Sequence, residues 1–513
     1  MSILHKIAGR ILGNSSEASA HEHSAARAWQ GASVCEALEA RAYMGADPLS
    51  FTLYYPEGFA NNSINEFVPI TNPNAQPVQF QLLARYETGE RDQIIATGTI
   101  AANSRGGVTI SDSQNPGARV VRPNTPYALV LNSSLAVTAA ISRYDFGTAI
   151  GESFTETTST QWTFGDIWKD TTDSRDFILV YNPSDLQSNV TITIFGANGI
   201  VHSESRLVDP QRRGGWSIQD ITQVPEGIYG VRITATQFVV AAQSRYELNT
   251  GRGWGVIGTT NGSAADGVLT AAGYSDNFYQ RNGDDLNGQR FAANSTIGIL
   301  NTNSSPTIAL VTLTFQFDNT NLNTQSRVVT VRANSAARFS LREFGLPQDN
   351  NFSVTYRANV PVTMTGARYQ GQDATGMQAS TVAATQWTFG EGYMSQARGG
   401  SAVIESLHIY NPTGITSLRL QIDVLGTNGS VLTIERFLLS RTITVVDLHN
   451  IDELRNRAAD QWYGLRVTSV QPVVVSFEHW DAGNGGGFGS PLLPSNFILP
   501  FRDALAIDNG PAQ

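Results

Sequence analysis

The sequence predicts an all-β protein built of four tandem β-sandwich domains, and three observations carry that prediction. An apolar run followed by an Asn-initiated turn recurs at intervals the size of one domain. Alternation of apolar and polar residues with a period of two follows each copy, which is typical of half-buried strands. Charged residues make up only 15% of the chain, and the repeated region has no helical heptads.

The recurring turn places the four copies along the chain. It reads Ile70-Thr71-Asn72-Pro73, Val180-Tyr181-Asn182-Pro183 and Ile409-Tyr410-Asn411-Pro412, with a degenerate copy at Ile299-Leu300-Asn301-Thr302. Successive Asn residues are 110, 119 and 110 positions apart. A fixed period of this length indicates tandem domains rather than a solenoid of small repeats.

Each copy continues as a series of short strands. The first alternating strands are 78–86, 190–195, 311–317 and 418–425. In two copies the next turn is Asn198-Gly199 or Asn428-Gly429, and Asn-Gly favours a hairpin because both residues accept positive φ. Six to eight such strands per ~100 residues are the pattern of an immunoglobulin-like β-sandwich.

A longer repeat groups the copies into two duplicated pairs. Thr160-Gln161-Trp162-Thr163-Phe164-Gly165 recurs as Thr385-Gln386-Trp387-Thr388-Phe389-Gly390. We therefore expect units one-two and three-four to derive from one two-domain unit. The expected sandwiches span 50–158, 159–266, 267–383 and 384–500, between an N-terminal segment (1–49) and a C-terminal tail (501–513).

Glycine-, serine- and threonine-rich stretches separate the copies. They run over Gly147 to Thr160, Asn249 to Gly267 and Gly371 to Ala384. These stretches are too long for hairpins and lack periodicity, so we interpret them as linkers or strand-crossing loops. Linkers with few contacts predict a modular chain, in which 267–513 folds without the first pair of domains.

The N-terminal segment combines a short amphipathic helix with a family-like motif. Ile3, Ile7 and Ile11 recur at helical spacing, and no apolar stretch of a secretory signal follows. The segment from Cys35 to Leu49 resembles the LEPR-XLL segment of large exported bacterial surface proteins. Leu38-Glu39, Arg41 and Ala46-Asp47 match that pattern, whereas Ala40 replaces its proline and Tyr43-Met44 replace its leucines. A plain short helix leading into the first domain is the alternative.

The repeats carry a second resemblance, over roughly residues 50–490. An aromatic-Phe-Gly entry, the Asn-Pro turn, a strand ending at Asn-Gly and a closing strand before Arg-Tyr resemble tandem sandwich repeats of unknown function in bacterial cell-surface proteins. This resemblance implies a fold and an extracellular or cell-surface location. It carries no catalytic residues to transfer.

Charge and cysteine content restrict the partners. A net charge of −10 argues against nucleic acid, which requires a basic stripe. The single Cys35 precludes an intrachain disulfide. No apolar run reaches the ~18 residues of a transmembrane helix.

Candidate chemistry is sparse in the repeats. The four histidines there do not stand at metal-ligand spacing, and no Gly-x-Ser-x-Gly motif occurs. Asp284, Asp285 and Asn287 concentrate oxygen ligands in one loop, which makes calcium the one candidate metal. The loop lacks the alternating Asp register of a calcium loop, so a plain solvated loop is the competing interpretation. We expect no other cofactor.

Two aromatic features are candidates for ligand contact. Trp254, in the glycine-rich Gly251 to Gly255, is the candidate ligand-binding residue if the protein binds sugars, with Trp216 and Trp480 as further candidates for an exposed aromatic surface. The pairs Arg143-Tyr144, Arg245-Tyr246 and Arg368-Tyr369 recur at one place in the repeat, and the fourth copy has His479-Trp480. For these pairs we expect a buried Tyr bonded to backbone and an outward-facing Arg.

These features predict a non-enzymatic structural or adhesive protein of the cell surface. Its expected shape is an elongated rod, and its expected partners are other surface proteins or further copies of itself. A carbohydrate-binding extracellular protein, with glycans as partners, is the alternative. An enzyme ranks last because no catalytic motif supports it.

Overall fold

The computed structural model describes residues 49–508, apart from 90–91, 146–147, 261–263, 279–290, 371–372, 395–402, 457–460 and 482–486. Most of these residues lie in antiparallel strands, so the all-β prediction is confirmed. The strands form four groups, which we call lobes 1 to 4 in chain order. Each lobe has an outer four-stranded sheet and an inner one.

In lobe 1 the outer sheet has the order β4-β3-β6-β1 and the inner sheet β5-β2-β7-β8. The elements are β1 (Phe51–Tyr55), β2 (Asn65–Asn72), β3 (Val78–Tyr86), β4 (Asp92–Ile100), β5 (Ser104–Ser111), η2 (Pro116–Ala118), β6 (Tyr127–Ser133), β7 (Thr138–Asp145) and β8 (Thr148–Ser153).

Lobe 2 repeats this arrangement with one long strand, β14, that crosses from the outer to the inner sheet. The outer order is β12-β11-β14-β9, with β16 beside β9, and the inner order is β13-β10-β14-β15. The elements are β9 (Ser159–Lys169), β10 (Ser174–Asn182), β11 (Ser188–Gly196), β12 (Gly199–Val208), β13 (Arg212–Ser217), η3 (Ile218–Asp220), β14 (Gly227–Glu247), β15 (Arg252–Ile257) and β16 (Thr259–Thr260).

Lobe 3 has the outer order β20-β19-β22-β17 and the inner order β21-β18-β22-β23, with β22 as the long strand. The elements are β17 (Ala264–Phe278), β18 (Phe291–Asn301), β19 (Ala309–Phe317), β20 (Gln325–Val331), β21 (Ser335–Ser340), η4 (Leu341–Phe344), β22 (Asn350–Gln370) and β23 (Asp373–Gln378).

Lobe 4 has the outer order β28-β27-β30-β24 and the inner order β29-β26-β30-β31. The elements are β24 (Val382–Phe389), β25 (Tyr393–Met394), β26 (Val403–Tyr410), β27 (Leu418–Gly426), β28 (Val431–Leu438), β29 (Ile443–Asp447), η6 (Leu448–Asn450), α2 (Asp452–Arg455), β30 (Gln461–Asp481), β31 (Gly487–Pro491), β32 (Leu493–Ser495), β33 (Leu499–Pro500) and α3 (Phe501–Leu505). Among the described residues, no helix is both long and apolar enough to cross a membrane.

The repeated asparagine organises the same turn in every lobe. The Asn72 side-chain nitrogen donates to the carbonyl oxygens of Gln76 (2.8 Å) and Ala101 (2.8 Å), and its oxygen accepts from the Asn74 backbone N–H (2.9 Å). Asn182 and Asn411 make the same pattern of bonds. One buried amide therefore fixes both the turn and the approach of the return strand.

The degenerate third copy keeps this chemistry without the proline. Asn301 donates to the carbonyl oxygens of Thr307 (3.0 Å) and Val331 (3.1 Å). We expect Asn301→Ala to lower the free energy of unfolding by about 1–3 kcal/mol, because buried carbonyls lose their donor. Urea denaturation measures this change. The exposed Asn323→Ala is the matched control, and an equal effect of both variants would contradict the role of Asn301.

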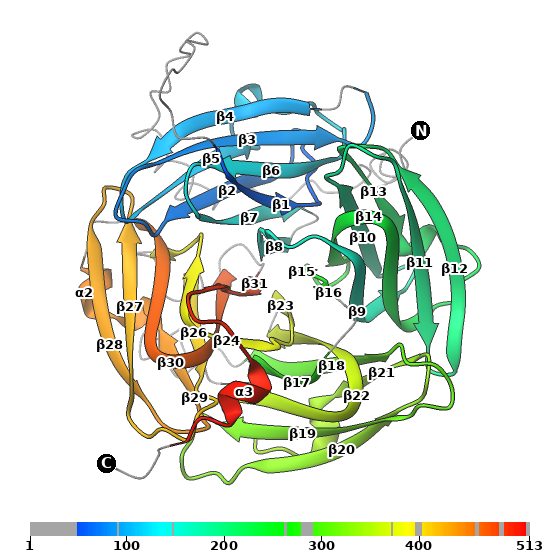
Figure 1. Ribbon diagram of the computed structural model, residues 1–513, viewed down its shortest axis with the longest axis vertical. Helices are drawn as coiled ribbons and strands as arrows, with labels where there is room; N and C mark the ends of the chain where they lie inside the picture. Colours follow the sequence, from blue (N-terminus) through cyan, green and yellow to red (C-terminus); the bar gives the residue numbers. More distant parts are fainter. Residues whose placement is uncertain are drawn as a thin grey trace.

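The lobes are arranged around a centre, as Figure 1 shows, so the expected elongated rod is wrong. Lobe 4 packs directly on lobe 1: the Thr71 hydroxyl donates to the Gly390 carbonyl oxygen (3.1 Å), and Arg466 Nη1 donates to the Pro73 carbonyl oxygen (2.7 Å). A closed ring results. We call the contacts between neighbouring lobes seams 1/2, 2/3, 3/4 and 4/1.

The centre of the ring is a hub formed by the inner-sheet edge strands β8, β15, β23 and β31 (Figure 1). In each of these strands a larger residue directly precedes a glycine. The larger residue packs against the equivalent glycine of the next lobe around the ring. A β-carbon placed on Gly376 would lie 2.3 Å from the Trp254 ring, and one on Gly151 would lie 2.3 Å from the Phe488 ring. Ile150 meets Gly255 and Thr375 meets Gly489 in the same way.

The hub corrects the interpretation of the glycine-rich stretches as linkers. Strands β8, β15 and β23 lie inside the three stretches that separate the copies. Their glycines are required because the lobes approach there more closely than any side chain allows. The expectation that these stretches make few contacts is therefore wrong. The expectation that 267–513 folds without the first two lobes stays a prediction.

Candidate functional site

The seams contain buried charged side chains, and these include the recurring Arg-Tyr pairs. The expected outward-facing arginines are wrong: Arg143, Arg245 and Arg368 are all buried. In two of the three pairs the tyrosine hydroxyl bonds to a side chain across a seam. Tyr246 donates to Glu57 Oε1 of lobe 1 (3.2 Å), and Tyr369 accepts from Arg338 (3.1 Å) and Arg245 (3.4 Å).

Seam 2/3 is centred on a carboxylate held by two arginines. Asp166 of lobe 2 lies 3.2 Å from Arg245 Nη2 and 3.3 Å from Nε of Arg338 of lobe 3. Burial acts to raise the pKa of Asp166, but the two guanidinium groups outweigh it, and the pKa is lowered. Asp166 therefore stays ionised and links the two lobes.

Seam 3/4 has an equivalent arrangement. Glu478 of lobe 4 lies 2.7 Å from Arg368 Nη1 of lobe 3 and 3.0 Å from His408 Nε2. It also accepts from the Thr375 hydroxyl (3.1 Å). Although burial opposes ionisation, Arg368 and His408 bring the pKa of Glu478 down to about 2. These groups hold the lobes together, and Glu478, Arg368, His408 and Thr375 are all buried.

The sequence-predicted ligand residues are not gathered into one site. Asp284, Asp285 and Asn287 lie outside the described residues, so the calcium loop stays a prediction. The described part of the chain has no group of three or more His, Cys, Asp or Glu arranged to hold a metal ion. The LEPR-XLL-like segment also lies outside the described residues, except Leu49.

Trp254, the candidate for sugar contact under the carbohydrate-binding alternative, does not lie on the surface. Its ring is fully buried in the hub, between Gly376 of lobe 3 and the Arg245 guanidinium carbon, which lies 4.6 Å from the ring centroid. Trp216 and Trp480 are also buried. An exposed aromatic surface for sugars is therefore not formed by these three side chains.

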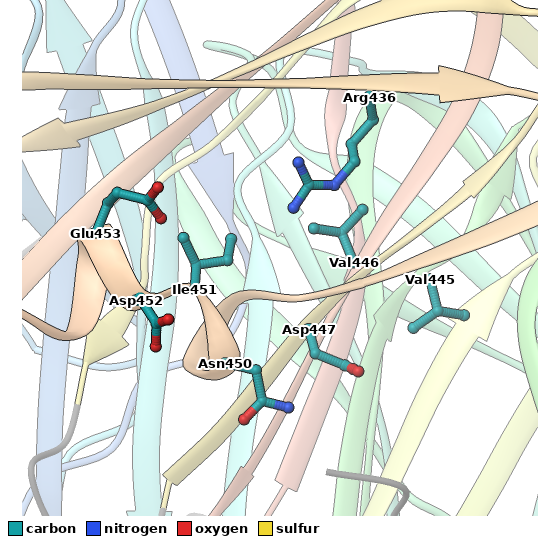
Figure 2. Close-up of a pocket in the computed structure, with 8 residues that line it drawn as sticks. All are labelled: Arg436, Val445, Val446, Asp447, Asn450, Ile451, Asp452 and Glu453. Atoms are coloured by element: carbon teal, nitrogen blue, oxygen red, sulfur yellow. The ribbon is translucent and has the colours of Figure 1, made fainter. Parts of the chain in front are cut away.

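A shallow pocket of about 350 Å³ lies on lobe 4, between β28, β29, η6 and α2. It is lined by Arg436, Val445, Val446, Asp447, Asn450, Ile451, Asp452 and Glu453. Figure 2 shows the Arg436 guanidinium at one side and the carboxylates of Asp452 and Glu453 at the other. Its volume is at the lower end of the range for small-ligand sites. The groups present can hydrogen-bond a small polyhydroxylated molecule.

The outer rim carries a feature that repeats in every lobe. Each outer sheet ends at an edge strand, β4, β12, β20 or β28, that pairs on one side only in the described part of the chain. Every one of these strands exposes large apolar side chains: Ile94 (57%), Ile200 (53%), Leu207 (65%), Val328 (66%) and Phe437 (63%). In the sequence these strands show only an alternation of apolar and polar residues. That alternation does not reveal that the outward face and the free edge of each strand are left uncovered by other elements.

Comparison with known proteins gives no family. No protein-family model matches the chain, and no curated protein matches it either. One similar solved structure is Thermotoga maritima 1070, with 20% identity, coverage of 24% of this chain and 96% of that chain, and a TM-score of 0.18. A second is a tetra-tandem repeat in the extending region of a large adhesion protein, with 11% identity, coverage of 82% of this chain and 92% of that chain, and a TM-score of 0.12. A third is the partial N-terminal region of an enterococcal surface protein, with 8% identity, coverage of 70% of this chain and 90% of that chain, and a TM-score of 0.16. TM-scores this low carry no argument about this chain.

Proposed function

We propose that this protein is a non-enzymatic structural or adhesive protein of the cell surface or extracellular space, which makes its contacts through the outer rim of the ring. The observation that carries the proposal is the repetition of an apolar, one-sided edge strand in all four lobes. Its partners would be other surface proteins or further copies of this chain.

Edge strands with exposed apolar residues are suited to protein contact. Their free N–H and C=O groups can pair with another strand, and natural proteins usually block such edges with charge or with a cover. Here the edge strands of all four lobes carry large exposed apolar side chains. Four such contacts on one particle can add avidity without any single strong site.

The rim can be tested by placing one lysine on each edge. We expect the quadruple variant Ile94→Lys, Leu207→Lys, Val328→Lys and Phe437→Lys to keep its fold, because all four side chains are more than half exposed. Self-association and retention on envelope fragments of the host cell should fall at least about tenfold, as charge and lost apolar area weaken each contact. Sedimentation velocity and a pull-down assay measure the two effects.

A matched variant separates the position of the lysines from their charge. Gln76→Lys, Gln223→Lys, Thr320→Lys and Thr427→Lys add the same four charges at exposed positions away from the edge strands. The proposal predicts that this variant behaves as the natural chain does. Equal losses in both variants would contradict contact through the rim.

Carbohydrate binding is the second candidate, and the pocket on lobe 4 is the observation that favours it. Asp447, Asn450 and Asp452 present hydrogen-bonding groups there, beside the apolar Val446 and Ile451. The test is a glycan array with the natural chain and with Asp452→Ala. A glycan signal that this substitution removes would favour the pocket over the rim.

A further inference from the structure

Seam 4/1 differs from the other three in its connectivity. Lobes 1 and 2, 2 and 3, and 3 and 4 follow one another in the chain, with only a few residues between the last strand of one and the first strand of the next. Lobes 4 and 1 come from opposite ends of the repeated region. Only non-covalent contacts therefore close the ring there.

The same seam carries the exception to the Arg-Tyr repeat. In the strand register Arg143 lies opposite Glu66, Arg245 opposite Asp176 and Arg368 opposite Ser295. The equivalent residue of lobe 4 is His479, which lies opposite Glu405. A histidine thus takes the place of an arginine that is charged at every physiological pH, and histidine can lose its charge near neutrality.

His479 is in direct contact with Phe488, the side chain that packs between lobes 4 and 1. Its Nδ1 lies 2.9 Å from Glu405 Oε1, and its ring stacks on Phe488 with centroids 4.6 Å apart and planes 10° from parallel. The Phe488 ring packs on Gly151 of lobe 1. The position of His479 is therefore coupled to the hub contact that closes the ring.

The charged groups that act on His479 belong to lobe 4, and groups of lobe 1 reach it through Glu391. Glu405 on β26, Glu391 after β24 and Asp481 on β30 all act on it electrostatically. From lobe 1, Arg105 on β5 faces Glu391, and the Ser142 hydroxyl donates to Glu391 across the seam.

Two tyrosines complete this group. Tyr144 on β7 of lobe 1 faces Asp481, Glu391 and Glu405, and it also faces Asp373 of lobe 3. Tyr463 on β30 donates to Glu405.

A second buried carboxyl lies in the same seam. Glu152 of lobe 1 accepts from the Ser490 hydroxyl of lobe 4 (2.6 Å), whose oxygen also lies 3.0 Å from the Ser153 hydroxyl oxygen. Among the described residues, the groups that act on Glu152 are Ser490, Ser153 and Ile257, and no arginine is one of them. This contrasts with Asp166 and Glu478 in the two seams described above, which are paired with arginine.

We propose that seam 4/1 is a pH-dependent closure of the ring: it is closed while His479 is protonated beside Glu405 and the buried Glu152 is neutral, and it opens as the pH rises. The proposal goes beyond the proposed function and does not depend on it. Opening would separate lobe 4 from lobe 1 while the tethered seams stay closed.

The signs of the titrations agree with this direction. Burial acts to lower the pKa of His479, but the hydrogen bond and charge of Glu405, with Glu391 and Asp481, outweigh it, and the pKa is raised. A raised histidine pKa means that its stabilisation is complete below the ordinary value of 6.5 and is lost as the pH rises through the raised value.

The carboxyls act in the same sense. Burial raises the pKa of Glu391, and it raises the pKa of Glu152 to about 8. Glu152 favours the closed seam in its neutral form, so closure loses stability as the pH rises from about 4.5 towards 8. The lowered pKa of Asp166, which is paired with two arginines, keeps its charge constant over this range, so seam 2/3 is the control.

The experiment reads the seam directly in the full-length chain. In a Cys35→Ser background, pyrene is attached at Ala101→Cys and Thr427→Cys, two exposed positions near the approach of Gly429 to the Ala102 carbonyl oxygen across seam 4/1. Excimer fluorescence reports whether the two labels are adjacent. The control pair is Asn198→Cys with Arg332→Cys, whose native side chains bond across seam 2/3 at 3.0 Å.

We expect the 4/1 excimer to fall between pH 6 and pH 9 while the 2/3 excimer stays constant. The opening equilibrium should rise about tenfold for each unit by which the pKa of His479 is raised. His479→Arg restores the residue found in the other three lobes and should keep the seam closed to a higher pH. A 4/1 excimer that is constant from pH 6 to 9 would overturn the proposal, and so would an unchanged pH profile in His479→Arg. If His479→Arg does not fold, the pH dependence of the two excimer signals in the chain that keeps His479 still tests the proposal.

Discussion

Gly376→Val is expected to be among the most damaging single substitutions in this chain. A β-carbon at this position would lie 2.3 Å from the Trp254 ring, and the ring has no room to move because it is fully buried. Overpacking of this kind typically costs 1–3 kcal/mol, so we expect a loss of about 3 kcal/mol in the free energy of unfolding. Thermal and urea denaturation measure it.

Two further variants show whether the hub causes the effect. Gly117→Ala, at an exposed glycine with open space around it, should change the free energy of unfolding by less than about 0.5 kcal/mol. Combining Gly376→Val with Trp254→Ala should cost less than the sum of the two single changes, because the second creates room for the first. Strict additivity would show that the two residues do not share a contact.

Arg245→Ala is expected to have the other large effect. The Arg245 side chain is fully buried and lies 2.9 Å from Asp176 Oδ1 and 3.2 Å from Asp166 Oδ1. Removing the cation leaves two buried carboxylates near each other, and breaking a buried pair in this way costs about 3–5 kcal/mol. The loss should be largest near neutral pH and smaller in acid, where the carboxylates can take up protons.

The comparison for Arg245 is an ion pair on the surface. Arg419 pairs with Glu435, and both side chains are largely exposed. Arg419→Ala should leave the denaturation midpoint unchanged, because exposed pairs contribute little. If Arg245→Ala were equally silent, the buried network would not be what joins lobes 2 and 3.

Local features of the fold could be predicted from the sequence, and the reason is their short range. Asn72 and its three counterparts bond to residues within about thirty positions, so the turn and the strands beside it follow from a local pattern. The alternation in β3 and β12 reflects one buried and one open face. Such patterns record which face of a strand is covered but not which element covers it.

The ring could not be predicted from the same patterns. Thr71 and Gly390, which meet at seam 4/1, are 319 positions apart, and nothing local marks them as neighbours. Glycine-rich stretches indicate loops when no other information is present, whereas here Gly255 and Gly376 allow strands of different lobes to approach. A usable signal did exist: a larger residue followed by glycine recurs a few positions after every Arg-Tyr or His-Trp pair.

The candidate sites were harder still to predict. Exposed tryptophan is a common feature of sugar-binding surfaces, but Trp254 is covered by a lobe whose position the sequence does not reveal. The apolar rim consists of side chains such as Leu207 and Val328, which look like core residues in an alternating strand. Only the sheet order shows that β12 and β20 are edges.

Small-angle X-ray scattering of the full-length chain at pH 6 tests the central claim, that four lobes close into one ring, most directly. A closed ring predicts a compact particle, with a radius of gyration of about 23 Å before the contribution of the N-terminal segment. Four lobes in an extended row would give roughly twice that value and a long tail in the distance distribution. The first result supports the closed ring, and the second would contradict it.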